Sequence, residues 1–146
     1  MNGRSQERGQ SLIEFAMVLP ILLLLAMGTI EFGRAYYQYN TLSKSVREGA
    51  RYMSMHGYTT AEQTNAKRMA CHGNTTGSGT PCVPGLTTGN IAVTSRGGGT
   101  TLATPPQWIK VAVTGYNFQP LFPSIIPSVP LTPAVEMRYV GANALY

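Results

Sequence analysis

Residues 12–30 read LIEFAMVLPILLLLAMGTI, nineteen residues that carry one charge, at Glu14. At about 1.5 Å per residue, a helix of this length is roughly 28 Å long, close to the hydrocarbon thickness of a bilayer, which is about 30 Å. A cleaved secretory signal has a shorter apolar core followed by an Ala-x-Ala-like site. No such site follows here and the helical pattern continues, so the sequence predicts a retained membrane-spanning helix.

Two residues inside this apolar run are unusual for a membrane span. An ionised carboxylate such as Glu14 costs several kcal/mol in hydrocarbon unless it is paired, although near the start of the run it could also reach the lipid headgroups. Pro20 removes one backbone hydrogen bond, so we expect a kink in the helix there.

The charges that flank the run predict its orientation. Arg4 and Arg8 precede it, and the next positive charge is Arg34. Positively charged flanks stay in the cytoplasm. We therefore expect a cytoplasmic N-terminus and the hundred-odd residues after the span outside the cytoplasm.

Beyond the span, apolar residues continue at heptad-like spacing, which predicts one helix over residues 11–55, near 65 Å long, that Gly57 ends. We expect the distal half of this seam to pack on the chain's own domain and the proximal half, around residues 32–39, to meet another subunit. The predicted helix-packing seam consists of Phe32, Ala35, Tyr39, Leu42, Val46, Gly49 and Met53.

The remaining chain predicts a small domain with a short helix and a few strands. A helix starts after Thr60 as N-cap, with Gln63 completing a capping box. Three β-type runs follow, at residues 91–95, 108–118 and 134–140, the last of which could return beside the second. The second run alternates, so that Ile109, Val111 and Val113 share one buried face. The connections expected between the runs are the turn Arg96-Gly97-Gly98-Gly99 and a Pro-rich crossing with Pro120, Pro123, Pro127, Pro130 and Pro133.

These elements give an α+β fold class: a long N-terminal membrane-spanning helix that continues into a small antiparallel β domain. The expected organisation is a leader at residues 1–9, a helix at residues 10–56 and a globular domain at residues 57–146. Within that helix, residues 12–30 cross the membrane and residues 31–56 are extracytoplasmic.

Cys71 and Cys82 are the two cysteines of the chain, and a Gly- and Thr-rich loop separates them. A disulfide between them would close a short loop and add about 2–3 kcal/mol in an oxidising compartment. The alternative is a pair of free thiols. We expect the disulfide.

The composition argues against several function classes. The charge of +5 is scattered and forms no basic stripe, so a nucleic-acid partner is not expected. His56 and His72 are the histidines, and the adjacent pair Cys71-His72 is poorly spaced to bind one zinc ion. Arg96-Gly-Gly-Gly lacks the ending of a phosphate loop, and the carboxylates Glu62 and Glu136 show no acid–base pairing. We expect no enzyme, no metal and no cofactor.

The N-terminal residues RGQSLIEFAMVLPILLLL resemble the class III signal of type IV pilin-like proteins. In that pattern a glycine ends a hydrophilic leader and a glutamate is fifth in the mature chain, as Gly9 and Glu14 are here. Many type IV pilins have Phe as the first mature residue, where this chain has Gln10. Residues 9–54 are similar to TadE-like proteins, which are minor pilins or pseudopilins of tight-adherence (Tad) pili, and include the blocks Glu31-Phe32-Gly33-Arg34 and Arg47-Glu48-Gly49-Ala50-Arg51.

The resemblance implies a structural function. A prepilin peptidase would cleave between Gly9 and Gln10, and the new cationic amine of Gln10 would pair with Glu14 of a neighbouring subunit in the membrane. The implied partners are that peptidase, other pilin-like subunits in a homo- or hetero-oligomer, and the Tad assembly platform. The implied location is the bacterial inner membrane, with a periplasmic C-terminal domain and incorporation into an adhesive pilus as a further step.

The alternative is an unprocessed single-pass membrane anchor that presents a periplasmic binding module. Under either hypothesis, Tyr58 and the Pro-rich stretch at residues 122–129 are candidates for a contact patch, although loops of that composition more often pack on themselves.

Overall fold

The computed structural model describes residues 3–101 and 103–141, with side chains from Gln10 onward. The chain divides after Tyr36 into two compact units, and helix α1 (Gly3–Met55) runs through both. The expected helix is confirmed at its C-terminal end, before Gly57, but it begins at Gly3 rather than at Ser11. The polar residues before the apolar run add turns because the helix is already nucleated, and each further turn then needs only propagation.

The first unit, residues 1–36, is helical throughout its described part. Side chains over residues 10–30 are exposed on every side of the helix, except that Met27 is half-buried. Among the described residues, α1 is the one helix long and apolar enough to cross a membrane, with a mean hydropathy of 2.3 over its most apolar window. The hydroxyl of Thr29 donates to the carbonyl of Leu25 at 2.8 Å, so this polar group is satisfied within the helix. The long apolar helix of the expected fold class is therefore present.

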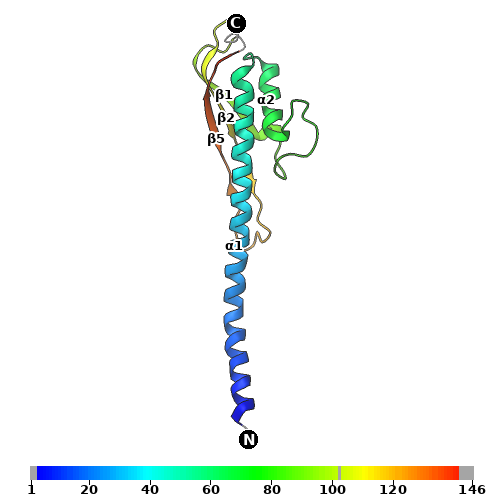
Figure 1. Ribbon diagram of the computed structural model, residues 1–146, viewed down its shortest axis with the longest axis vertical. Coiled ribbons are helices and arrows are strands. Elements are labelled where there is room, and N and C mark those ends of the chain that lie inside the picture. Colours follow the sequence, from blue (N-terminus) through cyan, green and yellow to red (C-terminus); the bar gives the residue numbers. More distant parts are fainter. Residues whose placement is uncertain (1–2, 102, 142–146) are drawn as a thin grey trace. The chain divides into compact units, whose positions relative to one another are not determined.

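The second unit, residues 37–146, packs a small sheet and a second helix on the distal part of α1 (Figure 1). Helix α2 (Thr60–His72) follows α1, and a 3-10 turn, η1 (Thr88–Asn90), leads into the strands. The main sheet contains β1 (Ile91–Gly98), β2 (Pro106–Val113) and β5 (Ala134–Arg138), all antiparallel in the order β1-β2-β5. Two short strands, β3 (Asn117–Phe118) and β4 (Val129–Pro130), pair separately.

The sheet confirms the α+β expectation and the return of the last strand beside the second. Val111 pairs with Val93 on one side and with Val135 on the other, so β2 is the central strand. Ile109, Val111 and Val113 are all buried, as the alternation of that run predicted. Because side chains alternate between the two faces of a strand, these three residues line the face that packs on the helices.

The core of this unit joins all of its layers. Met53 of α1, Ala66 of α2 and Ile109 of β2 form one buried cluster with Tyr58. Tyr58 is 6% exposed and its ring meets Tyr139 edge to face, so the expectation that Tyr58 belongs to an exposed contact patch is wrong. Tyr58 instead lies in the turn between α1 and α2, and its side chain is part of the core.

The C-terminal end of α1 is fixed by the last strand. The backbone N–H groups of Val140 and Gly141 both donate to the carbonyl of Ser54 at 3.0 Å, and the Tyr139 hydroxyl donates to the carbonyl of His56 at 2.9 Å. Carbonyls in the last turn of a helix have no partner inside the helix. Residues at the far end of the sequence supply those partners here.

Three local expectations need correction. Thr59, not Thr60, caps α2: its hydroxyl accepts from the N–H of Glu62 at 3.2 Å, so the proposed box with Gln63 is one residue out of register. The second strand ends at Val113 rather than at residue 118. The segment from Arg96 to Gly98 belongs to β1, because Arg96 pairs with Trp108 and Gly98 with Pro106; glycine tolerates the positive φ angles at positions 97 and 98.

At Gly49, α1 and α2 approach each other closely. A Cβ atom there would lie 2.9 Å from the carbonyl oxygen of Ala66 and 2.9 Å from the Cβ of Ala70. Both of these atoms are held in position by the backbone of α2, so neither can move away as the end of a flexible side chain could. The absence of a side chain at Gly49 therefore sets the separation of the two helices.

We predict that Gly49→Ala lowers the free energy of unfolding of the domain by about 1–3 kcal/mol, the usual cost of overpacking. Denaturant unfolding of the detergent-solubilised protein measures it. Gly33→Ala is the matched control, because a Cβ at Gly33 meets nothing within 4 Å and alanine is the better helix former. Equal stability of the two variants would contradict the close packing.

A second prediction concerns the hydrogen bond of 2.6 Å that the Tyr52 hydroxyl donates to Glu62. This bond holds the pKa of Glu62 below its ordinary value, whereas burial and then the bond to Glu62 raise the pKa of Tyr52. The contribution of Glu62 is therefore present above its unfolded pKa and lost as the pH falls through the lower, folded pKa. That of Tyr52 is present below its unfolded pKa and lost as the pH rises through the higher, folded pKa.

Tyr52→Phe should lower the free energy of unfolding by about 1 kcal/mol at neutral pH and should flatten its decline on acidification. Unfolding midpoints measured from pH 3 to pH 8, a range of about five units around the ordinary carboxyl pKa, provide the test. Tyr37→Phe is the control, since the Tyr37 side chain is 70% exposed. Parallel pH curves for Tyr52→Phe and the unmodified chain would exclude the coupling.

Candidate processing and assembly segment

The expected cleavage position and the membrane carboxylate lie one helical turn apart on α1. The amide Nε2 of Gln10 donates to Oε1 of Glu14 at 3.4 Å, and both side chains are exposed. Gly9 is part of the same helix. Because glycine is the weakest helix former after proline, Gly9 is the position in this stretch where the helix opens at least cost. A peptidase that needs extended backbone would gain access there.

Pro20 lies inside α1, and the helix continues through it. Proline has no N–H to donate, so the carbonyl of Ala16, four residues earlier, loses its usual helical donor. The expected kink remains a prediction. The local weakening of the hydrogen-bond ladder follows from the covalent structure of proline.

The predicted seam on α1 divides into two environments. Leu42, Val46 and Met53 are fully buried in the second unit, and Gly49 is buried as well. Phe32 is 73% exposed and Tyr39 is 44% exposed, while Ala35 is half-buried. The part of the seam that the small domain covers thus begins at Leu42.

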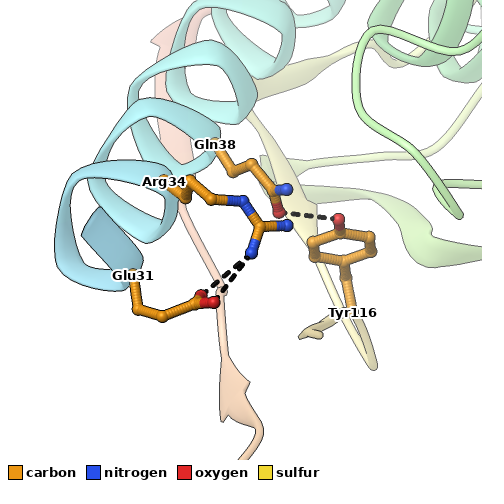
Figure 2. A network of polar contacts seen from close by, with 4 residues as sticks. All are labelled: Glu31, Arg34, Gln38 and Tyr116. Atoms are coloured by element: carbon orange, nitrogen blue, oxygen red, sulfur yellow. Dashed lines mark hydrogen bonds and ion pairs between the residues drawn. The ribbon is translucent and has the colours of Figure 1, made fainter. Parts of the chain in front are cut away.

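A charged pair lies between the apolar run and that covered part. One Nη of Arg34 donates to both carboxylate oxygens of Glu31, at 2.9 and 3.1 Å (Figure 2), and Glu31 is 3% exposed. The i,i+3 spacing places the two side chains on one face of the helix. A buried carboxylate needs such a partner. The i,i+3 spacing of Glu31 and Arg34 in the Glu31-Phe32-Gly33-Arg34 block is the sequence signal of this ion pair.

One turn beyond Arg34, the loop that precedes β3 contacts α1. The hydroxyl of Tyr116 lies 3.0 Å from the amide oxygen of Gln38 (Figure 2) and 3.0 Å from the carbonyl of Pro84. Burial, with the neighbouring Cys82 as a lesser cause, raises the pKa of Tyr116 above its ordinary value. A neutral phenol therefore joins three segments that are distant in sequence, and no sequence pattern had indicated it.

The expected disulfide is wrong for this structure, in which Cys71 and Cys82 are free thiols. Their backbones meet, since the N–H of Cys82 donates to the carbonyl of Cys71 at 2.8 Å. The sulfurs, however, contact different carbonyls: Cys71 Sγ lies 3.7 Å from that of Leu86, and Cys82 Sγ lies 3.7 Å from that of Ala70. Cys71 is buried in the last turn of α2 and Cys82 is exposed, so burial, more than the neighbouring sulfur, raises the pKa of the Cys71 thiol.

His56 and the candidate carboxylates have local partners, whereas the buried Nδ1 of His72 has no hydrogen-bond partner in the described part of the chain. His56 stacks on Tyr52 with 3.9 Å between ring centroids, and its Nδ1 lies 2.7 Å from the Tyr52 carbonyl. Glu136 pairs with Arg96 across the sheet at 3.0 Å. No group of three or more metal-ligating side chains occurs within the described part of the chain.

Comparison with known proteins gives one match. Residues 9–51 match the family model described as TadE-like protein. No curated protein and no solved structure matches the chain. The match begins at Gly9, covers the apolar run with Glu14 and Pro20, and ends in the buried half of the seam. Residues 9–51 are therefore similar to TadE-like proteins, as the resemblance of the N-terminal sequence indicated.

Proposed function

We propose that the chain is a pilin-like structural subunit, a minor pilin or pseudopilin, of a Tad-type adhesive pilus, and that a prepilin peptidase processes it. The observation that carries this proposal is the TadE-like match over residues 9–51, whose first residue, Gly9, is the expected cleavage position. The function is assembly rather than catalysis. The N-terminus faces the cytoplasm, and the domain after the span faces the periplasm.

Cleavage after Gly9 would change the charge balance at the start of the helix. A new α-amino group at Gln10 has an ordinary pKa of about 7.7–8.0, so it is largely cationic at neutral pH. Glu14 then has a partner of opposite charge in a neighbouring subunit whose helix is in register. An out-of-register subunit would leave both charges unpaired in an apolar environment, at considerable cost. The pair therefore selects the correct stagger of the helices.

The exposed part of the seam supplies the surface for that neighbour. Phe32 and Tyr39 lie on the predicted seam and are exposed, whereas the seam from Leu42 onward is used by the chain's own domain. The apolar run before them is exposed on all sides and can exchange lipid for other helices. Pilin-like subunits, the Tad platform and the peptidase are the partners that this arrangement would serve.

The first test is the N-terminus of the protein isolated from its native membranes. Intact-mass and N-terminal peptide measurements should find a chain that starts at Gln10, with or without methylation. Gly9→Val should retain the leader because a β-branched residue obstructs the scissile bond, while Gly28→Ala, near the end of the span where a Cβ meets nothing within 4 Å, should be processed normally. A native chain that starts at Met1 would contradict processing and would favour the unprocessed anchor of a periplasmic binding module.

Glu14→Leu tests the pairing itself. The substitution removes the carboxylate and should abolish piliation and adherence while membrane insertion stays intact or improves slightly. Glu48→Leu is the matched control, because Glu48 is an exposed carboxylate on the same helix outside the apolar run. Pilus counts, adherence and membrane fractionation provide the measurements. Normal piliation with Glu14→Leu would show that the carboxylate does not guide assembly.

A further inference from the structure

The hairpin between β3 and β4 presents apolar side chains to solvent. Its stem is short, with Asn117 paired to Pro130 and Phe118 paired to Val129, and the side chains of Phe118 and of Leu131, the residue after the stem, are buried. The ten residues of the tip, 119–128, expose large hydrophobic groups instead of covering them. The exposed fractions are 61% for Leu121, 43% for Phe122, 59% for Ile125 and, at the stem, 46% for Val129.

The chemistry of the hairpin suits an apolar medium. No charged residue occurs between Lys110 and Glu136. The N–H groups of Ile125 and Ile126 both donate to the carbonyl of Phe122 at 3.0 Å, which closes one turn at the tip. The prolines at 120, 123, 127 and 130 have no N–H to desolvate. The prolines and the two bonded N–H groups therefore reduce the number of backbone donors that would lose water if the tip left the aqueous phase.

The hairpin leaves the second unit at the end where α1 enters it. The N–H of Leu131 donates to the carbonyl of Tyr116 at 2.9 Å, and the Tyr116 hydroxyl reaches Gln38, the second residue of this unit. The β1–β2 connection lies at the opposite end of the sheet (Figure 1). Beside Gln38, the Tyr37 side chain is 70% exposed. Exposed tyrosines next to an apolar span are typical of the membrane–water interface.

The covalent chain keeps this end of the domain near the bilayer. The apolar run ends at Ile30, and Gln38 follows eight residues later. Those residues cover about 12 Å as a helix and at most about 29 Å fully extended. The tether therefore limits how far Gln38, and the hairpin that Tyr116 joins to it, can lie from the leaflet into which the span emerges.

We propose that residues 119–129 form a lipid-binding hairpin, which inserts Leu121, Phe122 and Ile125 into the headgroup–acyl boundary of that leaflet. The inference rests on the membrane span and is independent of leader cleavage and pilus assembly. A lipid surface fits this hairpin better than a protein partner because its exposed large side chains are apolar, no charged residue lies among them and an internally bonded turn supports them. The small domain is thus anchored at two points, α1 and the hairpin.

Depth-dependent quenching of tryptophan by brominated lipids tests the proposal on the full-length protein in phosphatidylcholine vesicles. The one native tryptophan, Trp108, is replaced by Phe, and single reporters are introduced as Ile125→Trp, Leu22→Trp and Thr100→Trp. Ile125 and Thr100 are exposed, so a tryptophan at either position leaves the core intact. Leu22 lies in the span, and Thr100 lies in the β1–β2 connection.

The expected result has three parts. The reporter at position 125 shows blue-shifted emission that shallow bromines quench strongly, the reporter at position 22 is quenched by deep bromines, and the reporter at position 100 shows water-like, unquenched emission. Water-like emission at position 125 together with quenching at position 22 would overturn the hairpin proposal alone. Blue-shifted emission at position 125 without bromine quenching would overturn it in favour of a protein contact. Unquenched emission at position 22 would overturn it together with the membrane span.

Discussion

In hydrocarbon, every backbone N–H and C=O group must be paired inside the chain, and a continuous α-helix is the way one segment can satisfy this requirement alone. The rest of the structure depends on α1, which meets this requirement as a continuous helix except at the carbonyl of Ala16, whose helical donor Pro20 removes. The helix does not stop where its apolar run ends, so the segment suited to a membrane also becomes the support for a small sheet and a second helix. The side chains of α1 must therefore suit two environments: an apolar medium around one part of the helix, and a small protein core packed against the other part.

The change of environment is visible in the pattern of exposed side chains. In the first unit, apolar groups surround the helix, as expected where the medium itself is apolar. From Leu42 onward, buried residues recur on one stripe, and the opposite side carries the exposed residues Lys44, Arg47, Glu48 and Arg51. Gly49 lies within the stripe and allows α2 to approach closely. The N-terminal part of α1 thus has apolar side chains on all sides, whereas its C-terminal part is amphipathic.

Sequence reasoning predicted features that depend on local pattern. The apolar run, the helix end before Gly57, the buried face of Ile109, Val111 and Val113, and the pairing of the last strand with the second all followed from periodicity and turn residues. The predictions from sequence were wrong where tertiary contacts determine the local structure. Tyr58 looked like a surface tyrosine until the core cluster enclosed it, and the register of the α2 cap shifted by one residue because Glu62 serves both Thr59 and Tyr52.

The candidate site was predictable to a similar extent. Gly9, Gln10 and Glu14 were recognised by their spacing within a family pattern, which a sequence displays directly. The link from Tyr116 to Gln38 was not predictable, because it joins residues 78 positions apart through a side chain that carries no motif. The disulfide prediction was wrong because a short separation in sequence between two cysteines does not fix the direction in which each sulfur points.

The last strand has a consequence for the order in which the domain forms. β5 pairs with the central strand, and the residues after it complete the hydrogen bonding at the end of α1, so Tyr139 contacts a residue 83 positions earlier. Contacts of such sequence separation form late, since the chain between them must be ordered first. The second unit therefore completes its main sheet and the hydrogen bonding at the end of α1 only when β5 and the residues after it have joined.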